Sequence, residues 1–528
     1  MKSLYLTLAF MATLFGTSYS QSITVPANLN GTTAFPFTYI DDFITADTFP
    51  DGKHKNVTYL LQRGGLYFFT KLNTWTFDVK LVATGDLAKG RPVISRANKT
   101  GGTALDGLYR GFGSFTWDGL YIIMGEEGAT ASQYESTPFW CEGDNNRYIF
   151  NDCIIEKSRQ GTIRIEGENT KTYITNCWLR NFGDYEKFQG NGRVVDTRDN
   201  FSDTVVIRNN VIHNILDRLY IGFRQKGLNY FDFSQNTVFN HVGRHGLIQL
   251  RNTKQSIIKD NLFMNPSIMG TSPTLANEQI TYLNKTNYLF TIDSIVPGAT
   301  MNMSNNNIFW TQDVLNHYTA STLVTKPLIL SPEVAGMLAD PSKAYFTEVL
   351  ELNNVPSRAP VIKYSEEAVK YPDSVGITDI MVEDISFKGT AFDKGYLFDW
   401  SKFDPCYNKN SLSAKSASDG GAVGSRFMCN YVSSTEELVF NPLLDFSSSP
   451  NPTSNITTFK YNLANSSQVD LSVFDMRGNK IINIFNGIKG PGYHNETWTG
   501  ANELPTGMYF ANLQTEEGRM FVKIVVQK

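Results

Sequence analysis

A short phrase recurs along the middle of the chain, an Asn or Asp residue followed within a residue or two by large apolar side chains. It occurs seven times, and its anchor residues are separated by 34, 24, 34, 26, 25 and 46 residues. Intervals near 25 residues with occasional insertions are typical of a solenoid, in which each coil packs on its neighbours. The anchors are Asp118, Asp152, Asn176, Asn210, Asn236, Asn261 and Asn307.

The residues between the anchors indicate the kind of coil. Each interval holds short β-branched or aromatic runs with period-two alternation, such as 161–165, 219–223 and 246–250, and a second run ends at the next anchor. We therefore predict at least two strands per coil, stacked at about 4.8 Å into parallel sheets around an apolar column. The anchors should be structural, passing amide hydrogen bonds from coil to coil. An unstacked Asn-rich loop protein is the alternative, but it would not keep an apolar residue after every anchor.

The composition excludes some partners. The chain has 47 Lys+Arg against 51 Asp+Glu, a net charge of -4, so nothing favours a nucleic acid or an anionic membrane surface. Aromatic residues make up 13%, and there are 41 glycines, as many short strands and turns require.

Five cysteines form an odd set, so at least one has no disulfide partner within the chain. Cys153 and Cys177 each follow an anchor, and we expect them to stack inside the column, with a disulfide as the alternative. Cys406 and Cys429 flank a Ser/Gly-rich loop and are candidates to bridge it. The remaining cysteine is Cys141, and no Cys/His cluster suggests zinc.

The amino terminus has the pattern of an export signal. Lys2 precedes an apolar stretch at 4–15 and small residues at 18–20, so we predict a signal peptide over 1–20, an uncleaved anchor being the alternative. No later window is long and apolar enough to span a membrane, and we expect no transmembrane segment in the mature chain. Beyond the signal we expect a lead-in and cap over 21–112, coils over 113–310, and a far-end cap with long loops over 311–435.

The last part of the chain carries its most specific motifs. After a linker at 436–452, short strand-like runs separated by Gly turns predict a small antiparallel β-sandwich over 453–528. The motifs are Pro450-Asn-Pro452, Val473-Phe-Asp-Met-Arg-Gly478, Leu504-Pro-Thr-Gly-Met-Tyr-Phe510 and Lys523-Ile-Val-Val526. They resemble the type A C-terminal sorting domain of the type IX secretion system of Bacteroidetes. The resemblance implies an exported, secreted or surface-attached protein, associated with the outer membrane, whose residues 453–528 engage the secretion machinery. A carbohydrate-binding or Ig-like accessory sandwich is the alternative.

The repeat region, over about residues 90–430, resembles the right-handed parallel β-helix of pectate-lyase-like proteins. Specifically, it resembles exported Bacteroidetes relatives that end in a Thr-Asp-Gly-Gly-like turn, here at 418–426. The expected fold class is therefore all-β, a right-handed parallel β-helix solenoid with capping segments and a small C-terminal antiparallel β-sandwich. The resemblance specifies the fold better than the reaction, because one fold carries many chemistries.

A lyase acting on a uronic-acid polymer needs a cation beside the substrate carboxylate, a base for the adjacent proton and an acid or water for the leaving oxygen. We expect Arg251, Lys254 and His245 near the chemistry and Arg164 and Arg224 at the substrate, Arg164 pointing outward between two inward isoleucines. A solvated basic face is the alternative. Further cations in or beside these strands are Arg193, Arg218 and Arg244.

The same coils do not predict a metal or other cofactor. Calcium would need clustered carboxylates, and residues 246–254 hold no such pair. Trp117, Trp140 and Trp178 are candidates either to stack on sugar rings or to pack in the core. Two functions remain open. One is a secreted protein that binds or breaks down a polysaccharide, with lyase-like activity as an option, and the other is a noncatalytic surface adhesin or glycan-binding display protein.

Overall fold

The computed structural model describes most of the chain in two compact units, the first spanning Ser22–Glu437 and the second comprising Leu438–Lys528. The predicted signal peptide at 1–20 lies outside the described residues. These are 22–33, 35–97, 108–124, 135–183, 191–243, 245–271, 288–322, 324–370, 403–429, 444–463, 465–475, 479–516 and 518–528.

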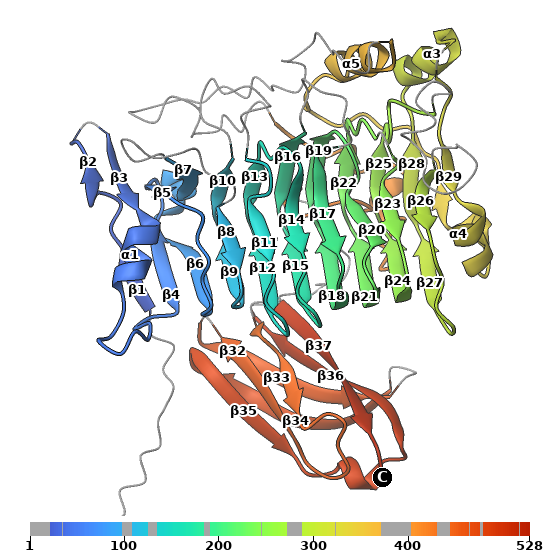
Figure 1. Cartoon of the computed structure of the whole chain (residues 1–528). Coiled ribbons are helices and arrows are strands. Elements are labelled where there is room, and N and C mark those ends of the chain that lie inside the picture. Colours follow the sequence, from blue (N-terminus) through green and yellow to red (C-terminus); the bar gives the residue numbers. More distant parts are fainter. Residues whose placement is uncertain are drawn as a thin grey trace, which may run out of the picture. The chain divides into compact units, whose positions relative to one another are not determined.

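The first unit is a parallel β-helix, as predicted. Its strands stack coil on coil into three long sheets, visible side by side in Figure 1. A full coil contributes one strand to each sheet in turn, so the prediction of at least two strands per coil is confirmed, with three the actual number. Every ladder in these sheets is parallel except the first hairpin.

Sheet 1 has ten strands. They are β1 (Ser22–Val25), β4 (Thr58–Gln62), β6 (Val79–Thr84), β9 (Phe115–Asp118), β12 (Arg147–Asn151), β15 (Lys171–Thr175), β18 (Phe201–Arg208), β21 (Gly227–Ser234), β24 (Thr253–Lys259) and β27 (Thr300–Ser304).

Sheet 2 has twelve strands. They are β2 (Asn30–Gly31), β3 (Pro36–Tyr39), β5 (Leu66–Phe69), β7 (Val93–Arg96), β10 (Tyr121–Ile123), β13 (Ile154–Glu156), β16 (Trp178–Phe182), β19 (Val211–Ile215), β22 (Thr237–Phe239), β25 (Leu262–Met264), β28 (Asn306–Phe309) and β30 (Tyr345–Phe346).

Sheet 3 has eight strands. They are β8 (Tyr109–Gly111), β11 (Phe139–Cys141), β14 (Gly161–Ile165), β17 (Arg193–Arg198), β20 (Tyr220–Arg224), β23 (Ile248–Leu250), β26 (Tyr288–Ile292) and β29 (Leu328–Leu330).

The stacking starts earlier than the repeat phrase suggests. We predicted coils from residue 113, but sheet 1 already begins at β1 and sheet 2 at β2. Sheet 3 begins at β8. The early strands lack the anchor phrase because their inward residues alone, such as Tyr59, Leu61 and Leu81, fill the column. Burial by alternate side chains therefore builds these turns without a recurring Asn.

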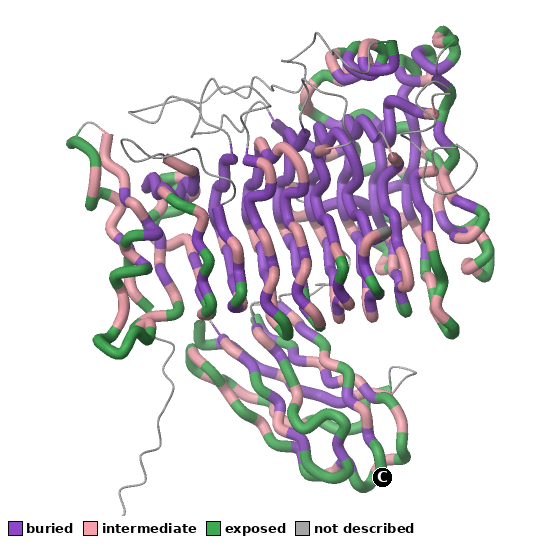
Figure 2. Tube along the Cα trace, in the orientation of Figure 1, coloured by how far each residue is buried: buried purple, intermediate pink, exposed green. Residues whose placement is uncertain are grey.

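An apolar cluster fills the interior of the column along its length. Figure 2 shows that the strand centres are buried. Ile163 and Ile165 are fully buried, and Arg164 between them points outward, as predicted. Trp117 and Trp178 are also fully buried, so both have packing roles. Trp140 is the one member of the predicted tryptophan set that is partly exposed.

The corner between sheets 1 and 2 carries the Asn ladder, in a register different from the predicted one. The ladder residues directly precede β19, β22 and β25, and the last one is the first residue of β28. Asn210 donates to Asn236, Asn236 to Asn261 and Asn261 to Asn306, with Nδ2 to Oδ1 distances of 2.9, 3.1 and 2.9 Å. The residue before each ladder position has a positive φ. These left-handed residues are Gly119, Asp152, Asn176, Asn209, Gln235, Asp260 and Asn305.

The predicted anchors thus mix neighbouring positions. Asn210, Asn236 and Asn261 are ladder residues, whereas Asp152 and Asn176 are left-handed corner residues followed by cysteines in the ladder position. Asn307 is not a ladder residue. It follows the ladder residue Asn306, and its register partner in the neighbouring strand β25 is Leu262. Asn suits both positions, because its amide can stack and its short polar side chain tolerates a positive φ.

A covering segment, residues 403–429, closes the outer face of sheet 2. The ring of Phe403 stacks on Trp178 at 4.2 Å between centroids, and the amide of Gly424 donates to the carbonyl of Asp260 at 2.8 Å. The disulfide Cys406–Cys429 closes the loop, one of the pairings the sequence allowed. Cys141, Cys153 and Cys177 are free thiols in the buried core, as expected for the last two.

Helices gather toward the two ends of the first unit. Helix α4 begins where Ser331 accepts a hydrogen bond from the amide of Val334 and Pro332 starts the first turn, a common N-terminal pattern. In the described part of the chain the α-helices are α1 (Ile40–Ala46), α3 (Gln312–Ala320), α4 (Pro332–Met337) and α5 (Ala359–Lys370). The 3₁₀ turns described there are Leu87–Lys89, Pro341–Lys343, Ser413–Lys415 and, in the second unit, Ala501–Glu503.

The second unit is an antiparallel β-sandwich, as predicted, with its own core that includes Phe459, Val469 and Leu513. One sheet has the order β31 (Ser447–Ser449), β32 (Thr457–Leu463), β35 (Gly492–Trp498). The other has the order β34 (Lys480–Lys489), β33 (Ser467–Phe474), β36 (Gly507–Thr515), β37 (Gly518–Val526).

Candidate functional site

The outward face of sheet 3 collects most of the predicted cations. Register places one outward residue per coil in a single row, because in-register parallel strands repeat each side chain's direction. Their inward neighbours, such as Ile163 and Ile248, lie in the core. From β8 to β26 the row is Arg110, Trp140, Arg164, Asp196, Ile221, Gln249 and Thr291.

The first part of this row is a stack of two cations and one aromatic ring. The guanidinium carbons of Arg110 and Arg164 each lie 4.6 Å from the ring centroid of Trp140. Arg110 also pairs with Glu142 at 2.6 Å, and Arg164 pairs with Glu166. Cation–π and ion-pair contacts thus hold both guanidinium groups at the surface without burying them.

The next part is built on the buried carboxylate of Asp196. Its Oδ2 accepts from Nη1 of Arg193 at 3.1 Å and from Nη2 of Arg198 at 2.8 Å. Arg224 aligns with Arg198 in the following coil. Burial and the neighbouring charge of Arg198 lower the pKa of Arg224, so positive charge is crowded here.

A second buried carboxylate, Asp217, holds His245. Nδ1 of His245 lies 2.7 Å from Oδ1, while Nε of Arg193 lies 3.2 Å and Nη2 of Arg218 3.5 Å from Oδ2. Burial alone would raise the pKa of Asp217, but the charges of Arg218 and His245 hold that pKa well below its usual range. An ionised Asp217 accepts only, so Nδ1 of His245 carries the proton that it donates.

Further along, a polar chain crosses two more coils. Arg218 donates to Oε1 of Gln249, whose Nε2 donates to Asp293 Oδ2 at 2.9 Å. Burial raises the pKa of Asp293, and the charge of Arg251 opposes that rise. The carbonyl of Arg251 accepts from Nε2 of Gln225 at 2.6 Å, which fixes the backbone just past β23.

The predicted site residues therefore divide between two sheets. His245, Arg224 and Arg251 belong to the sheet 3 side, and Arg164 lies in the outward row of the same sheet. Lys254 is on β24 of sheet 1, where its Nζ lies 5.8 Å from the ring centroid of Phe201. Arg244 lies outside the described residues.

The sequence analysis missed Asp217. Asp217 precedes a strand at a coil corner, where alternation no longer states which way a side chain points. The only signal in the sequence is its position directly before Arg218, which is too common a pair to be specific.

We name as the basic cluster Arg193, Asp196, Arg198, Asp217, Arg218, Arg224 and His245. Four guanidinium groups face two carboxylates, which leaves an excess of two positive charges before His245 is counted. The carboxylates are fully buried, whereas the side chain of Arg198 is 23% exposed. The acids thus position cations that reach the surface, an arrangement suited to an anionic ligand.

Metal ligands are not assembled at the basic cluster. Within the part of the chain that the structure describes, one set of side chains has the spacing of a metal site, Asp404 with Cys406 and Cys429, and its two sulfurs form the disulfide. Bonded sulfurs offer no thiolate, so this set does not fit a thiolate metal site.

Comparison with known proteins concerns the second unit. Residues 449–527 match the family described as the secretion system C-terminal sorting domain. The chain is thus a protein sorted for secretion, secreted or held at the cell surface. No curated protein matches the chain. Among the residues that the structure describes, none of the helices has the length and apolar character needed to cross a membrane.

Proposed function

We propose that the protein, once exported, binds an acidic polysaccharide along the outward face of sheet 3. The observation that carries this proposal is the excess positive charge of the basic cluster, held in place by two buried carboxylates. Partly exposed arginines continue it on both sides, with Arg164 in the outward row and Arg251 after β23. Coils repeat at about 4.8 Å, so arginines held on neighbouring coils can meet successive negative charges of an extended polyanion.

Trp140 adds a second element suited to sugars. Its partly exposed ring lies between Arg110 and Arg164, so an apolar surface adjoins guanidinium groups that donate to carboxylates. Each face of the ring carries a guanidinium group, so its exposed edge is the apolar surface that remains for a sugar, and the guanidinium groups bind carboxylates through paired hydrogen bonds. An acidic glycan presents both features.

A lyase-like reaction is the second candidate, and the pairing of His245 with Asp217 favours it. A carboxylate that fixes the Nδ1 proton leaves Nε2 of the neutral imidazole as the base. In β-elimination that base would remove the proton beside the substrate carboxylate, whose charge Arg224 and Arg251 would neutralise. The bond to the glycosidic oxygen would break as the double bond forms, and water would protonate the leaving oxygen. Lys254 on sheet 1 would contact the polymer beyond the reacting sugar. A noncatalytic adhesin would use the same cations without this step.

Binding is tested by affinity electrophoresis of the mature protein in gels containing pectate, alginate or hyaluronan. Replacing Arg224 by Gln should weaken binding about tenfold, because a hydrogen bond to a charged group contributes about 1.5 kcal/mol. The matched control is Lys171→Gln, which removes one positive charge from sheet 1 and should leave mobility unchanged. Added salt should also weaken binding, as screening predicts.

The same polymers distinguish binding from cleavage. Ultraviolet absorbance of unsaturated uronate products should rise with the intact protein and fall to background in His245→Gln if the reaction occurs. Binding without absorbance selects the adhesin. No retardation on any acidic polymer, or equal retardation on uncharged dextran, contradicts the proposal.

A further inference from the structure

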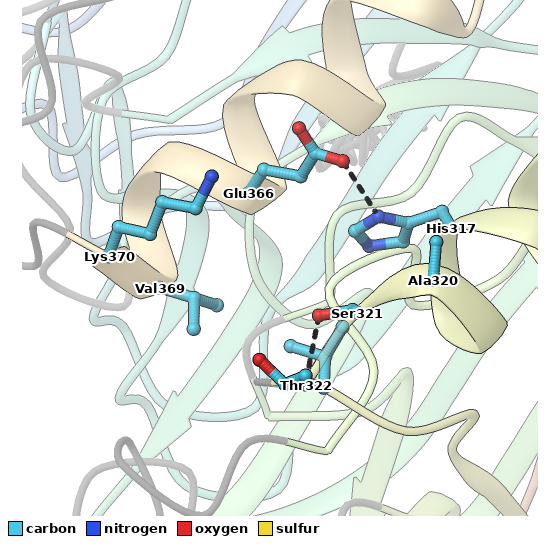
Figure 3. A pocket seen from close by; sticks show the side chains of 8 residues that line it. His317, Ala320, Ser321, Thr322, Glu366, Val369 and Lys370 are labelled. Carbon is cyan, nitrogen blue, oxygen red and sulfur yellow. Dashed lines mark hydrogen bonds and ion pairs between the residues drawn. The ribbon is translucent and has the colours of Figure 1, made fainter.

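A separate pocket lies between helices α3 and α5 (Figure 3). Its volume is about 240 Å³. Pockets for drug-sized ligands occupy about 300–1,000 Å³, so this one suits a smaller molecule. None of its lining residues belongs to the basic cluster. His317 and Ser321 come from α3 and the turn after it, and Glu366 and Lys370 come from α5.

His317 is the central group of this pocket. Its side chain is 2% exposed, and its Nδ1 lies 3.3 Å from Oε1 of Glu366, which is 46% exposed. An ionised carboxylate accepts and never donates, so Nδ1 of a neutral imidazole carries the proton and Nε2 keeps a lone pair. Figure 3 shows the ring pointing from α3 into the space between the helices.

Nε2 of His317 is buried and has no hydrogen-bond partner among the described residues. Leaving a buried acceptor unsatisfied costs about 1–3 kcal/mol. A ligand hydroxyl that donates to Nε2 removes this cost, so the pocket favours a molecule with hydroxyl groups over an apolar one.

The remaining walls define the rest of the ligand. Lys370 lies one helical turn from Glu366 on the same side of α5 and brings a positive charge to the pocket. Thr322 adds a hydroxyl, while Val324 and Val369 form an apolar side. Hydroxyl groups, one negative charge and a partly apolar ring match these walls together.

We propose that the pocket binds one hydroxylated organic acid of monosaccharide size, such as a free hexuronic acid. A ligand hydroxyl donates to Nε2 of His317, and the ligand carboxylate lies near Lys370. This binding does not depend on polymer binding by sheet 3, because it uses other residues.

The test is isothermal titration calorimetry of the mature full-length protein with galacturonate, glucuronate and uncharged galactose. At least one uronate should bind about tenfold more tightly than galactose. Lys370→Met should reduce uronate affinity about tenfold and leave galactose affinity unchanged. His317→Phe should abolish binding of all three sugars.

Two further variants keep the test decisive if His317→Phe disturbs folding. The side chain of Glu366 is half-exposed, so Glu366→Gln should fold normally. The amide of Gln can donate to Nδ1 of His317, so the proton of the imidazole is no longer held on Nδ1. The affinity for the sugars should therefore fall several-fold. Thr319→Ala changes an exposed position of α3 outside the pocket and should bind as the natural protein does. Absence of heat with both uronates, equal affinity for galactose and uronate, or unchanged binding in folded Glu366→Gln and Lys370→Met overturns the proposal.

Discussion

His241 fixes the corner that carries Asp217. Its Nδ1 accepts from the amide of Ser267 at 3.1 Å, so Nε2 must carry the proton that it donates to the carbonyl of Asp217 at 2.5 Å. Both nitrogens are committed, and the side chain is fully buried. A second proton would place N–H against N–H, so the folded state requires the neutral ring.

This requirement predicts a pH-dependent stability. Burial lowers the pKa of His241 from 6.5 to about 4. The unfolded chain therefore takes up a proton on His241 near pH 6.5, and the folded chain only near pH 4. The stability that neutral His241 contributes is fully present above pH 6.5 and is lost as the pH falls from 6.5 to 4. At pH 4.5 the loss should be about 2.5 kcal/mol, from 1.36 kcal/mol for each pKa unit.

Urea unfolding at pH 7.5 and pH 4.5 measures this contribution. The Gln side chain of His241→Gln can make both hydrogen bonds and does not titrate. Between pH 7.5 and pH 4.5 the free energy of unfolding should therefore fall by about 2.5 kcal/mol less in this variant than in the natural protein. Other acidic groups affect both proteins alike. Equal losses in the two proteins would show that His241 does not titrate in this window.

At the scale of single elements, the strands were more predictable than the corners between them. Alternation around Ile163, Arg164 and Ile165 states which residue faces out, because a strand has only two sides. No such rule holds at a corner, so the sequence analysis treated Asn176 and Asn210 as the same kind of anchor. In the structure Asn176 is a left-handed corner residue and Asn210 is a ladder residue. For the same reason the contacts of Asp217 and His245 could not be predicted, even though the sequence analysis proposed His245 and Arg224 as site residues.

The corrected register gives a prediction for the ladder. Cys177 occupies a ladder position, and its amide already donates to Oδ1 of Asn210 at 2.8 Å. Asn236 makes the same contact to Asn261 and adds a second donor from its side chain. Cys177→Asn should therefore extend the ladder by one hydrogen bond and stabilise the protein by about 1 kcal/mol.

The reverse exchange is the matched comparison. Asn236→Cys keeps a side chain of similar size but interrupts the ladder between Asn210 and Asn261, leaving buried donors and acceptors unsatisfied. It should cost about 2–3 kcal/mol or more. Thermal unfolding of the two variants beside the natural protein gives the comparison. Destabilisation of similar size in both would mean that the ladder amides contribute little beyond packing.

At the scale of the whole molecule, the sequence indicated two structural units for different reasons. The β-helix was predicted from a repeated pattern, which describes a fold and not a reaction. The sandwich was predicted from four ordered motifs, which the match over residues 449–527 supports. The pocket between α3 and α5 had no sequence signal, because it depends on how two short helices far apart in the chain approach each other.

The two units should also be separable. The two large apolar clusters of the first unit contain no residue of Leu438–Lys528, and the sandwich has its own buried centre. A chain ending at Glu437 should therefore keep the β-helix unfolding temperature within about 2 °C, because it loses none of that core. In a bacterium with a type IX secretion system the shortened chain should no longer reach the cell surface or medium. Calorimetry and cell fractionation measure the two effects. A lower unfolding temperature would mean that the sandwich stabilises the β-helix, and continued export would mean that the sorting signal lies elsewhere.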